Sequence, residues 1–155
     1  MFLDSVHIDH PEHWLVSWNL DGQAYKDLRV YADEVTYPSG AVIFSEGDPS
    51  DGMYLVLMGM VIVTMLDAHG QEQILRVINE NQSFGELGLL VGTSRHATVK
   101  AGPKVRLLRL APEQLNRLER EKPELSSQVY KVLARTLAEQ WMRGGVWVGR
   151  APTSR

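Results

Sequence analysis

Gly85, Glu86 and Arg95 form a short segment whose residue types can bind an oxyanion. A strand-like run gives way at Gly85 to a helical turn expected over residues 86–90, and Arg95 follows nine residues after Glu86 (95 − 86). The start of such a turn presents unpaired N–H groups and a partial positive charge, which favour an anion. Glycine lets an oxyanion approach the backbone closely. The planar guanidinium of Arg95 can bind the same anion through two hydrogen bonds.

Glu86 adds a second kind of recognition to this segment. Taken alone, an acid at a helix start is explained by the helix dipole, and a lone arginine is usually a surface residue. An ionised carboxylate only accepts hydrogen bonds, so beside a phosphate it indicates a ligand that also carries hydroxyl groups. A phosphate next to a sugar hydroxyl describes a nucleotide. The segment therefore predicts a nucleotide site.

The elements that position these residues are predicted from turn signals and hydrophobic spacing. Short β-rich runs recur roughly every 8–12 residues between turns, a pattern typical of a β barrel or sandwich. The runs cover residues 35–37, 42–44, 54–57, 61–63, 74–78, 98–101 and 105–110, with a further run interrupted at Gly85.

Helices are predicted on both sides of the β region. Two short ones are expected over residues 11–20 and 24–32, and two more over residues 112–120 and 123–142. Each of the last two begins at a proline, which suits a first helical position. In the final helix, four residues at helical spacing either pack against the β region or form a dimer seam. These are Val129, Val132, Thr136 and Leu137.

Composition excludes several classes of protein. The 155 residues are 44% hydrophobic and 23% charged, close to the globular average, which argues against disorder, fibres and rods. The absence of cysteine excludes disulfides, zinc–thiolate sites, iron–sulfur clusters and cysteine nucleophiles. Neither a signal peptide nor a membrane span is apparent, so a cytoplasmic protein is expected. The three histidines near the N-terminus, His7, His10 and His13, are interpreted as an incidental cluster and not as a metal site.

The net charge of −3 is unevenly distributed. Residues 1–100 hold five Lys/Arg and fourteen Asp/Glu, or −9, whereas residues 101–155 hold eleven and five, or +6. Such a division is explained by two structural layers with solvated charges, or by a basic surface for a partner. The basic part is expected to meet an acidic partner or the chain's own acidic part.

In the Gly85 segment the sequence resembles the cyclic-nucleotide-binding domain family. The phosphate cassette of that family reads roughly F-G-E-L-A-L-h-x-x-x-P-R-x-A-T-V. The corresponding residues here are Phe84-Gly85-Glu86-Leu87-Gly88-Leu89-Leu90, then Arg95 and Ala97-Thr98-Val99. Upstream, residues 37–44, 46–48 and 54–57, with Gly59, match the family's first turns and a following strand. The resemblance covers roughly residues 24–142.

The resemblance implies a fold that is mainly β with flanking helices. We expect an eight-stranded antiparallel, jelly-roll-like β-roll with short N-terminal helices, a phosphate-cassette helix and two C-terminal helices. The expected divisions are an N-terminal helical lead over residues 1–33 and the nucleotide-binding roll over 34–110. The C-terminal helices of the same domain would occupy 111–143, and a flexible tail 144–155.

The resemblance also assigns roles within the cassette. Glu86 would accept a hydrogen bond from the ribose 2′-hydroxyl, and Arg95 would bind the exocyclic phosphate oxygens. Backbone N–H groups from Gly85 to Leu87, and that of Ala97, would complete the phosphate site.

Three positions leave alternatives open. Ser94 stands where the family usually has proline, which makes the loop less rigid. His96 replaces a small residue and either contacts the base or phosphate or points to solvent. The family's threonine at this position favours cGMP, so its absence favours cAMP. Trp141 is a possible cap on the base, the alternatives being helix packing or an interface.

The expected function is that of a non-enzymatic sensor that needs no cofactor and signals by movement of its C-terminal helix. Its partners would be a cyclic nucleotide, cAMP or cGMP, and either an effector protein or a second copy bound through that helix. Direct DNA binding is not expected, because too few residues follow Arg143 for a helix-turn-helix domain. Membrane binding is not expected either. The alternatives are a ligand-free interaction domain and a cupin-like metalloenzyme, although the strand region holds only His69 and His96.

Overall fold

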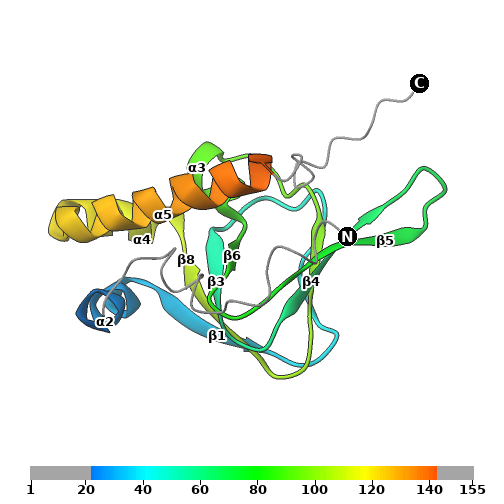
Figure 1. Cartoon of the computed structure of the whole chain (residues 1–155), viewed down its shortest axis with the longest axis horizontal. Helices are drawn as coiled ribbons and strands as arrows, with labels where there is room; N and C mark the ends of the chain where they lie inside the picture. Colours follow the sequence, from blue (N-terminus) through cyan, green and yellow to red (C-terminus); the bar gives the residue numbers. More distant parts are fainter. Residues whose placement is uncertain (1–21, 143–155) are drawn as a thin grey trace.

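Two four-stranded antiparallel sheets face each other in the structure, a computed structural model that describes residues 22–142 (Figure 1). One sheet has the strand order β1-β8-β3-β6 and the other β2-β7-β4-β5. The strands are β1 (Asp33–Tyr37), β2 (Val42–Phe44), β3 (Met53–Met58), β4 (Val61–Leu66), β5 (Glu72–Ile78), β6 (Ser83–Phe84), β7 (Thr98–Ala101) and β8 (Val105–Leu110). The predicted eight-stranded antiparallel roll is therefore confirmed.

The interior between the sheets follows from alternation along the strands. Successive side chains of a strand point to opposite faces, so residues two apart share a face. Tyr54 and Val56 on β3 are buried in this way, as are Val61 and Val63 on β4. They join a core cluster completed by Ile78, Phe84, Val99, Ala101, Val105 and Leu107.

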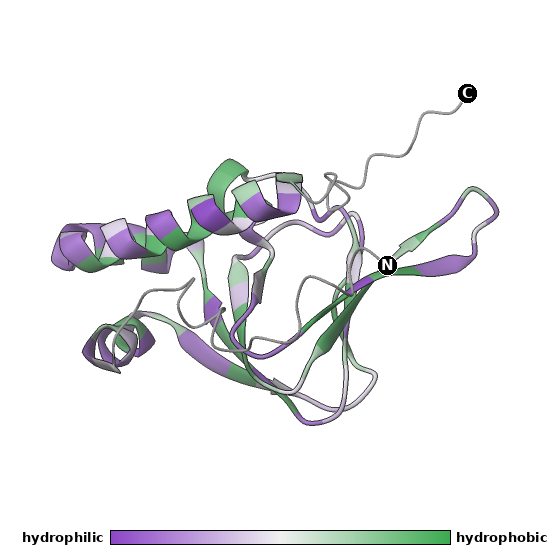
Figure 2. Ribbon diagram, in the orientation of Figure 1, coloured by the Kyte–Doolittle hydropathy of each residue, from purple (hydrophilic) through white to green (hydrophobic). Residues whose placement is uncertain are grey.

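Four helices complete the described part of the chain. They are α2 (Gly22–Tyr31), α3 (Glu86–Val91), α4 (Pro112–Glu121) and α5 (Pro123–Met142). A second core cluster joins α2, α4 and α5 to Leu55 of β3 and Leu108 of β8, and Figure 2 shows apolar residues recurring along these helices. The helices thus cover the outer face of the β1-β8-β3-β6 sheet. The two predicted C-terminal helices are confirmed.

The packing of α5 shows which of its apolar residues pack within the domain and which could form a dimer seam. Val129 and Val132 are buried in the second core cluster, at 0% and 3% exposure. These two residues therefore pack within the domain and are not available to a dimer seam. Thr136 and Leu137 are partly exposed.

Arginines of the basic part meet acids of the roll. Arg106 Nε lies 3.1 Å from Glu34 Oε2, and Arg109 Nη2 lies 3.3 Å from Asp33 Oδ2, both across the β1–β8 pairing. Exposed pairs of this kind contribute at most about 1 kcal/mol each. The basic part thus meets the chain's own acidic part through β8, and an acidic partner for the helices stays a prediction.

Several expectations fall on residues that the structure does not describe. These are the helix over residues 11–20, the histidine cluster His7, His10 and His13, and the tail over residues 144–155. Within residues 22–142, no helix is both long and apolar enough to cross a membrane. The same residues contain no cluster of three His, Asp or Glu side chains that is placed to hold a metal ion.

Candidate functional site

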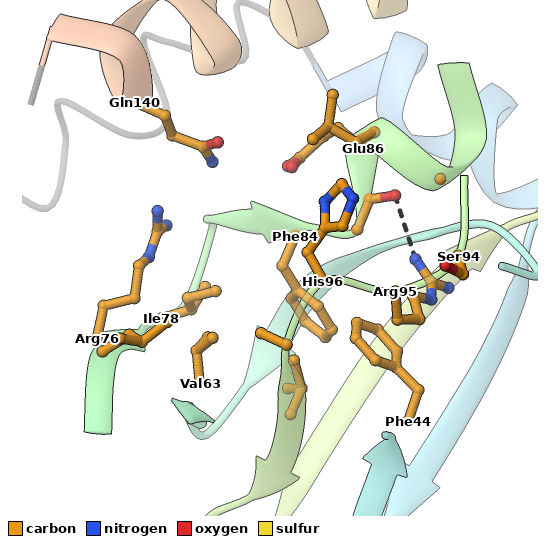
Figure 3. A pocket seen from close by; sticks show the side chains of 16 residues that line it. Phe44, Val63, Arg76, Ile78, Phe84, Glu86, Ser94, Arg95, His96 and Gln140 are labelled. Atoms are coloured by element: carbon orange, nitrogen blue, oxygen red, sulfur yellow. Dashed lines mark hydrogen bonds between the residues drawn. The ribbon is translucent and has the colours of Figure 1, made fainter. Parts of the chain in front are cut away.

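One pocket brings the cassette together with the second sheet and the end of α5 (Figure 3). It is open to solvent, and the empty space within it and at its mouth is about 690 Å³. Apolar side chains from β2, β4, β5, β6 and β7 form much of its wall, namely Phe44, Val63, Leu75, Ile78, Phe84 and Val99.

Gly85 shapes the entrance to α3. Its φ of +82° lies in the left-handed region, which suits glycine. A Cβ at this position would lie 2.8 Å from Arg95 Nη1 and 3.2 Å from the Gly52 carbonyl oxygen. The missing side chain therefore lets the Arg95 guanidinium lie directly against the backbone at the start of α3.

Glu86 is a buried acceptor in the pocket wall. The residue is only 3% exposed, and the Ser83 hydroxyl donates a 2.6 Å hydrogen bond to Oε2. A carboxylate offers about four acceptor positions, so this contact leaves capacity for a ligand hydroxyl. The geometry suits the predicted contact with a ribose.

Arg95 is a buried cation at the other side of the cassette, 4% exposed. Its Nη2 donates to Asp51 Oδ1 at 2.8 Å and to the Gly52 carbonyl at 2.7 Å, while Nη1 donates to the Gly85 carbonyl at 3.3 Å. The guanidinium carbon also lies 3.9 Å from the centre of the Phe44 ring, a cation–π contact. Within the described residues, the buried Nε has no hydrogen-bond partner. An oxyanion entering the pocket would supply the acceptor that this guanidinium still lacks.

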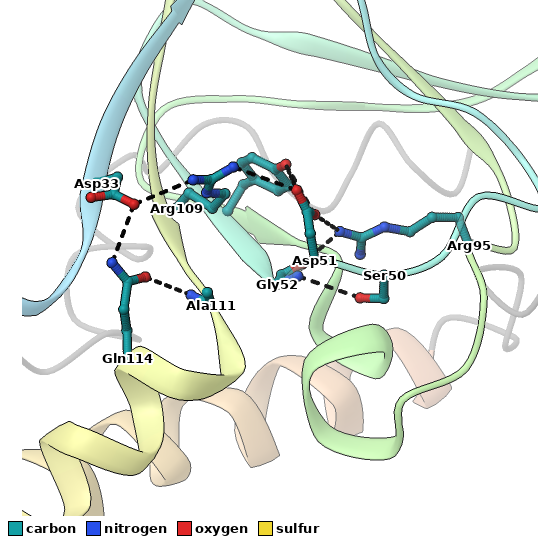
Figure 4. A network of polar contacts seen from close by, with 9 residues as sticks. Asp33, Ser50, Asp51, Gly52, Arg95, Arg109, Ala111 and Gln114 are labelled. Carbon is teal, nitrogen blue, oxygen red and sulfur yellow. Dashed lines mark hydrogen bonds and ion pairs between the residues drawn. The ribbon is translucent and has the colours of Figure 1, made fainter.

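Asp51 anchors this arginine to the roll (Figure 4). Its second oxygen lies 3.5 Å from Arg109 Nη1, and the Tyr54 hydroxyl donates to both oxygens at 3.3 Å. Burial, and then the Asp51 charge, raise the pKa of Tyr54 well above its usual range. Tyr54 therefore stays a donor at neutral pH. Together these contacts fix the carboxylate that orients Arg95.

The same polar network continues to the start of α4 (Figure 4). Arg109 also donates to Asp33 Oδ2 at 3.3 Å, and Gln114 Nε2 donates to the same oxygen at 3.2 Å. Gln114 in turn accepts the backbone N–H of Ala111 at 2.8 Å, which satisfies a donor at the helix start. The pocket arginine is thus linked by hydrogen bonds and ion pairs to the first turn of a C-terminal helix.

The other cassette residues predicted to bind ligand also line the pocket. Leu87, His96 and Ala97 contribute to its wall together with Ser94, the residue at the family's proline position. His96 is an exposed side chain at the pocket surface and does not point away from it (Figure 3). All six cassette residues singled out in the sequence are therefore brought together, and their ligand contacts stay predictions.

The possible cap on the base, Trp141, does not line the pocket in this structure. Trp141 is 70% exposed and is not among the pocket residues, whereas its neighbour Gln140 is 7% exposed and lines the pocket. Gln140 lies seven positions after the buried Leu133, so it continues the inward face of α5. One further residue turns the side chain by about 100°. In this structure, the residue of α5 that reaches the pocket is therefore a glutamine and not the tryptophan.

Arg76 is a second pocket residue that the sequence pattern did not identify. It lies on β5 opposite Val63, and both residues line the pocket. The alternation of β5 was the available signal, because Arg76 is two residues before the buried Ile78 and so shares its face.

Comparison with known proteins agrees with this geometry. Residues 34–122, more than half of the 155-residue chain, match the family model of the cyclic nucleotide-binding domain. The chain is 34% identical over 109 residues to the cyclic AMP receptor protein of Thermus thermophilus, covering 70% of this chain and 50% of that protein. It is 30% identical over 103 residues to a CRP-like cAMP-activated global transcriptional regulator of Mycobacterium tuberculosis, covering 66% and 46%. The chain thus spans about half the length of these curated relatives.

Solved structures show the same likeness. The N-terminal domain of a transcriptional regulator from Streptomyces coelicolor superposes with a TM-score of 0.69 at 32% identity, covering 79% of this chain and 86% of that one. A cyclic nucleotide-binding domain from Methylobacillus flagellatus gives a TM-score of 0.74 at 23% identity, covering 79% and 69%, which speaks to the fold alone. With the family model matched across the roll and the first C-terminal helix, the chain belongs to the cyclic nucleotide-binding domain family.

Proposed function

We propose that the pocket binds a cyclic purine nucleotide, with cAMP preferred over cGMP, and that the chain is a non-enzymatic regulatory module. The observation that carries this proposal is the meeting of Glu86 and Arg95 in one pocket. Glu86 is a buried acceptor for a ribose hydroxyl, and Arg95 is a buried guanidinium for the cyclic phosphate. The names of the two relatives, cAMP-activated regulator and cyclic AMP receptor, support the choice of adenine.

Gln140 can also contact the base of cAMP from the end of α5. A glutamine amide presents one donor and one acceptor side by side, which can pair with N7 and the N6 amino group of adenine. It also links ligand binding to α5, because Gln140 belongs to that helix. A ligand that binds more tightly when α5 closes over it shifts the population toward the closed state. This movement would signal to an effector protein or to a second copy.

Thermal denaturation in the presence of each nucleotide tests the proposal. A ligand at about 100 times its dissociation constant should add about 2.7 kcal/mol to the free energy of unfolding. We expect both cAMP and cGMP to raise Tm, with cAMP effective at the lower concentration, and 5′-AMP to serve as the non-cyclic control. No rise with either cyclic nucleotide would instead favour a ligand-free interaction domain. A cytoplasmic location, the effector and the absence of DNA and membrane binding stay predictions from the sequence.

The role of Glu86 is tested by changing each partner of its predicted contact with the ribose, the carboxylate and the 2′-hydroxyl. Glu86→Gln should weaken cAMP binding by about tenfold, since hydrogen bonds to charged groups contribute about 1.5–3 kcal/mol. The 2′-deoxy analogue of cAMP should bind the wild-type chain about equally weakly. The substitution weakens and the analogue removes the same contact, so together they should cost less than the sum of the two separate losses. Calorimetric titrations of both chains with both ligands measure this coupling. Fully additive losses would contradict the ribose assignment.

A further inference from the structure

Arg76 places a second guanidinium in the pocket, away from the cassette. It is partly buried on β5 and lines the same pocket as Arg95. Figure 3 shows Arg76 and Gln140 together on one side of the pocket and Arg95 on the other, with Glu86 and His96 between them. The apolar side chains of Val63 and Ile78 lie near Arg76 in the same view and line the pocket with it. The pocket therefore has one cationic group at each end.

Arg76 and Gln140 line the side of the pocket opposite Arg95. If the cassette holds the ribose and the cyclic phosphate, as in the proposed function on which this inference rests, the purine reaches toward Arg76 and Gln140. The apolar residues between the two ends suit the flat faces of a purine. Gln140 does not by itself select a base, because rotation of its amide exchanges donor and acceptor.

Arg76 can make that selection because a guanidinium is only a donor. Guanine presents two adjacent acceptors, O6 and N7, which match two donors of an arginine. Adenine presents the N7 acceptor beside an amino group that is itself a donor, so the second hydrogen bond is lost and two donors face each other. Arg76 also interacts with the rest of the chain, and five N–H donors allow one guanidinium to serve two partners.

We infer that Arg76 is a specificity-determining residue that reads the acceptor edge of the purine and raises the affinity for cGMP relative to cAMP. The expected preference for cAMP over cGMP is then smaller than the absence of the family's threonine at position 96 alone would give. The measurable consequence is a change in the ratio of the cGMP to the cAMP dissociation constant when Arg76 is replaced. This change is expected whichever of the two nucleotides binds more tightly.

The test is titration calorimetry of the wild type and Arg76→Gln with cAMP, cGMP and cyclic inosine monophosphate. The ratio of the cGMP to the cAMP dissociation constant should rise about tenfold in the variant, the effect of losing a bidentate arginine–guanine contact. Cyclic inosine monophosphate shares O6 and N7 with guanine but lacks its 2-amino group. In Arg76→Gln it should lose affinity as cGMP does. This comparison separates recognition of O6 and N7 from recognition of the 2-amino group.

Two matched variants make the result specific. Arg120→Gln removes one positive charge from the exposed face of α4 and should leave the ratio unchanged. Arg76→Lys keeps the charge but loses the planar fork, so its ratio should lie between those of the wild type and Arg76→Gln. It also provides a second measurement if Arg76→Gln does not fold, and each variant is checked by its melting curve.

The outcomes distinguish this inference from the function on which it rests. An unchanged ratio, or an equal loss of affinity for all three nucleotides, would overturn the role of Arg76 while leaving the nucleotide site intact. Failure of the wild-type chain to bind any of the three would overturn the proposed function, and the inference with it. A ratio that rises in Arg76→Gln but equally in Arg120→Gln would assign the effect to net charge and also overturn the inference.

Discussion

Replacing Arg95 by alanine is expected to weaken cAMP binding by about ten- to a hundredfold. The guanidinium is buried, lies at the entrance to α3, and has one nitrogen with no partner among the described residues. A bidentate, charge-assisted contact to a phosphate contributes about 1.5–3 kcal/mol to the free energy of binding. Salt screens such a contact little at a buried site. Titration calorimetry with cAMP measures the loss directly.

Two further variants control for charge and for folding. Arg95→Lys retains the positive charge but lacks the paired donors of the planar guanidinium. It should therefore bind cAMP more tightly than Arg95→Ala but more weakly than the wild type. Arg120→Ala removes an exposed arginine of α4 and should bind as the wild type does. Because Arg95 also holds Asp51 and the Gly52 carbonyl, its removal should lower Tm. Unchanged cAMP affinity in a folded Arg95→Ala protein would show that the phosphate site lies elsewhere.

Replacing Gly52 by alanine is expected to lower the free energy of unfolding by about 3 kcal/mol or more. The new Cβ would lie 2.4 Å from the Leu110 carbonyl oxygen and 3.0 Å from the Ala111 Cα. These are backbone atoms at the junction of β8 and α4, so they cannot move aside as a flexible side chain can. The φ of Gly52, +138°, is also a conformation that alanine adopts only with strain.

Gly70→Ala provides the matched control for this effect. Gly70 has a φ of +79°, but a Cβ added there would meet no atom within 4 Å, so its replacement tests backbone strain without a clash. It should cost about 1–2 kcal/mol. Urea denaturation of the two variants and the wild type gives the comparison. Equal losses would show that the close approach to Leu110 does not matter. Gly52→Ala should also weaken cAMP binding, because the Gly52 carbonyl holds Arg95.

The cassette was predictable from the sequence because its chemistry is local. Gly85, Glu86 and Arg95 lie within eleven residues (85 to 95), and one left-handed glycine and one short helix are enough to bring them together. The strands were predictable for a similar reason. Tight turns at positive-φ glycines such as Gly40 and Gly59 divide the chain into short alternating runs, and alternation determines which side chains face inward.

The remaining pocket residues were harder to predict because they depend on tertiary placement. Arg76 and Gln140 are sixty-four residues apart (140 − 76) and meet only when the end of α5 lies over the second sheet. Trp141, the possible cap on the base, does not line the pocket in this structure, because the angular position of the inward face of α5 places Gln140 there instead. The partner of Arg95 had no local signal either, since Asp51 lies forty-four residues before it.

The charge division also gained a structural explanation. Its basic part begins near the last two strands, and β8 pairs directly with the acidic β1, so Arg106 and Arg109 lie close to Glu34 and Asp33. Arg109 extends this pairing to Asp51 and so to the arginine of the pocket. Part of the asymmetry therefore reflects strand order within the roll and needs no external partner.

Titration calorimetry of the wild-type chain with cAMP tests the proposed nucleotide site most directly. We predict saturable binding of one cAMP per chain, weaker binding of cGMP, and a rise in Tm that follows the measured occupancy. Absence of heat and of any Tm change with both nucleotides at millimolar concentration would contradict the proposal. The chain would then keep the family's fold without its nucleotide site.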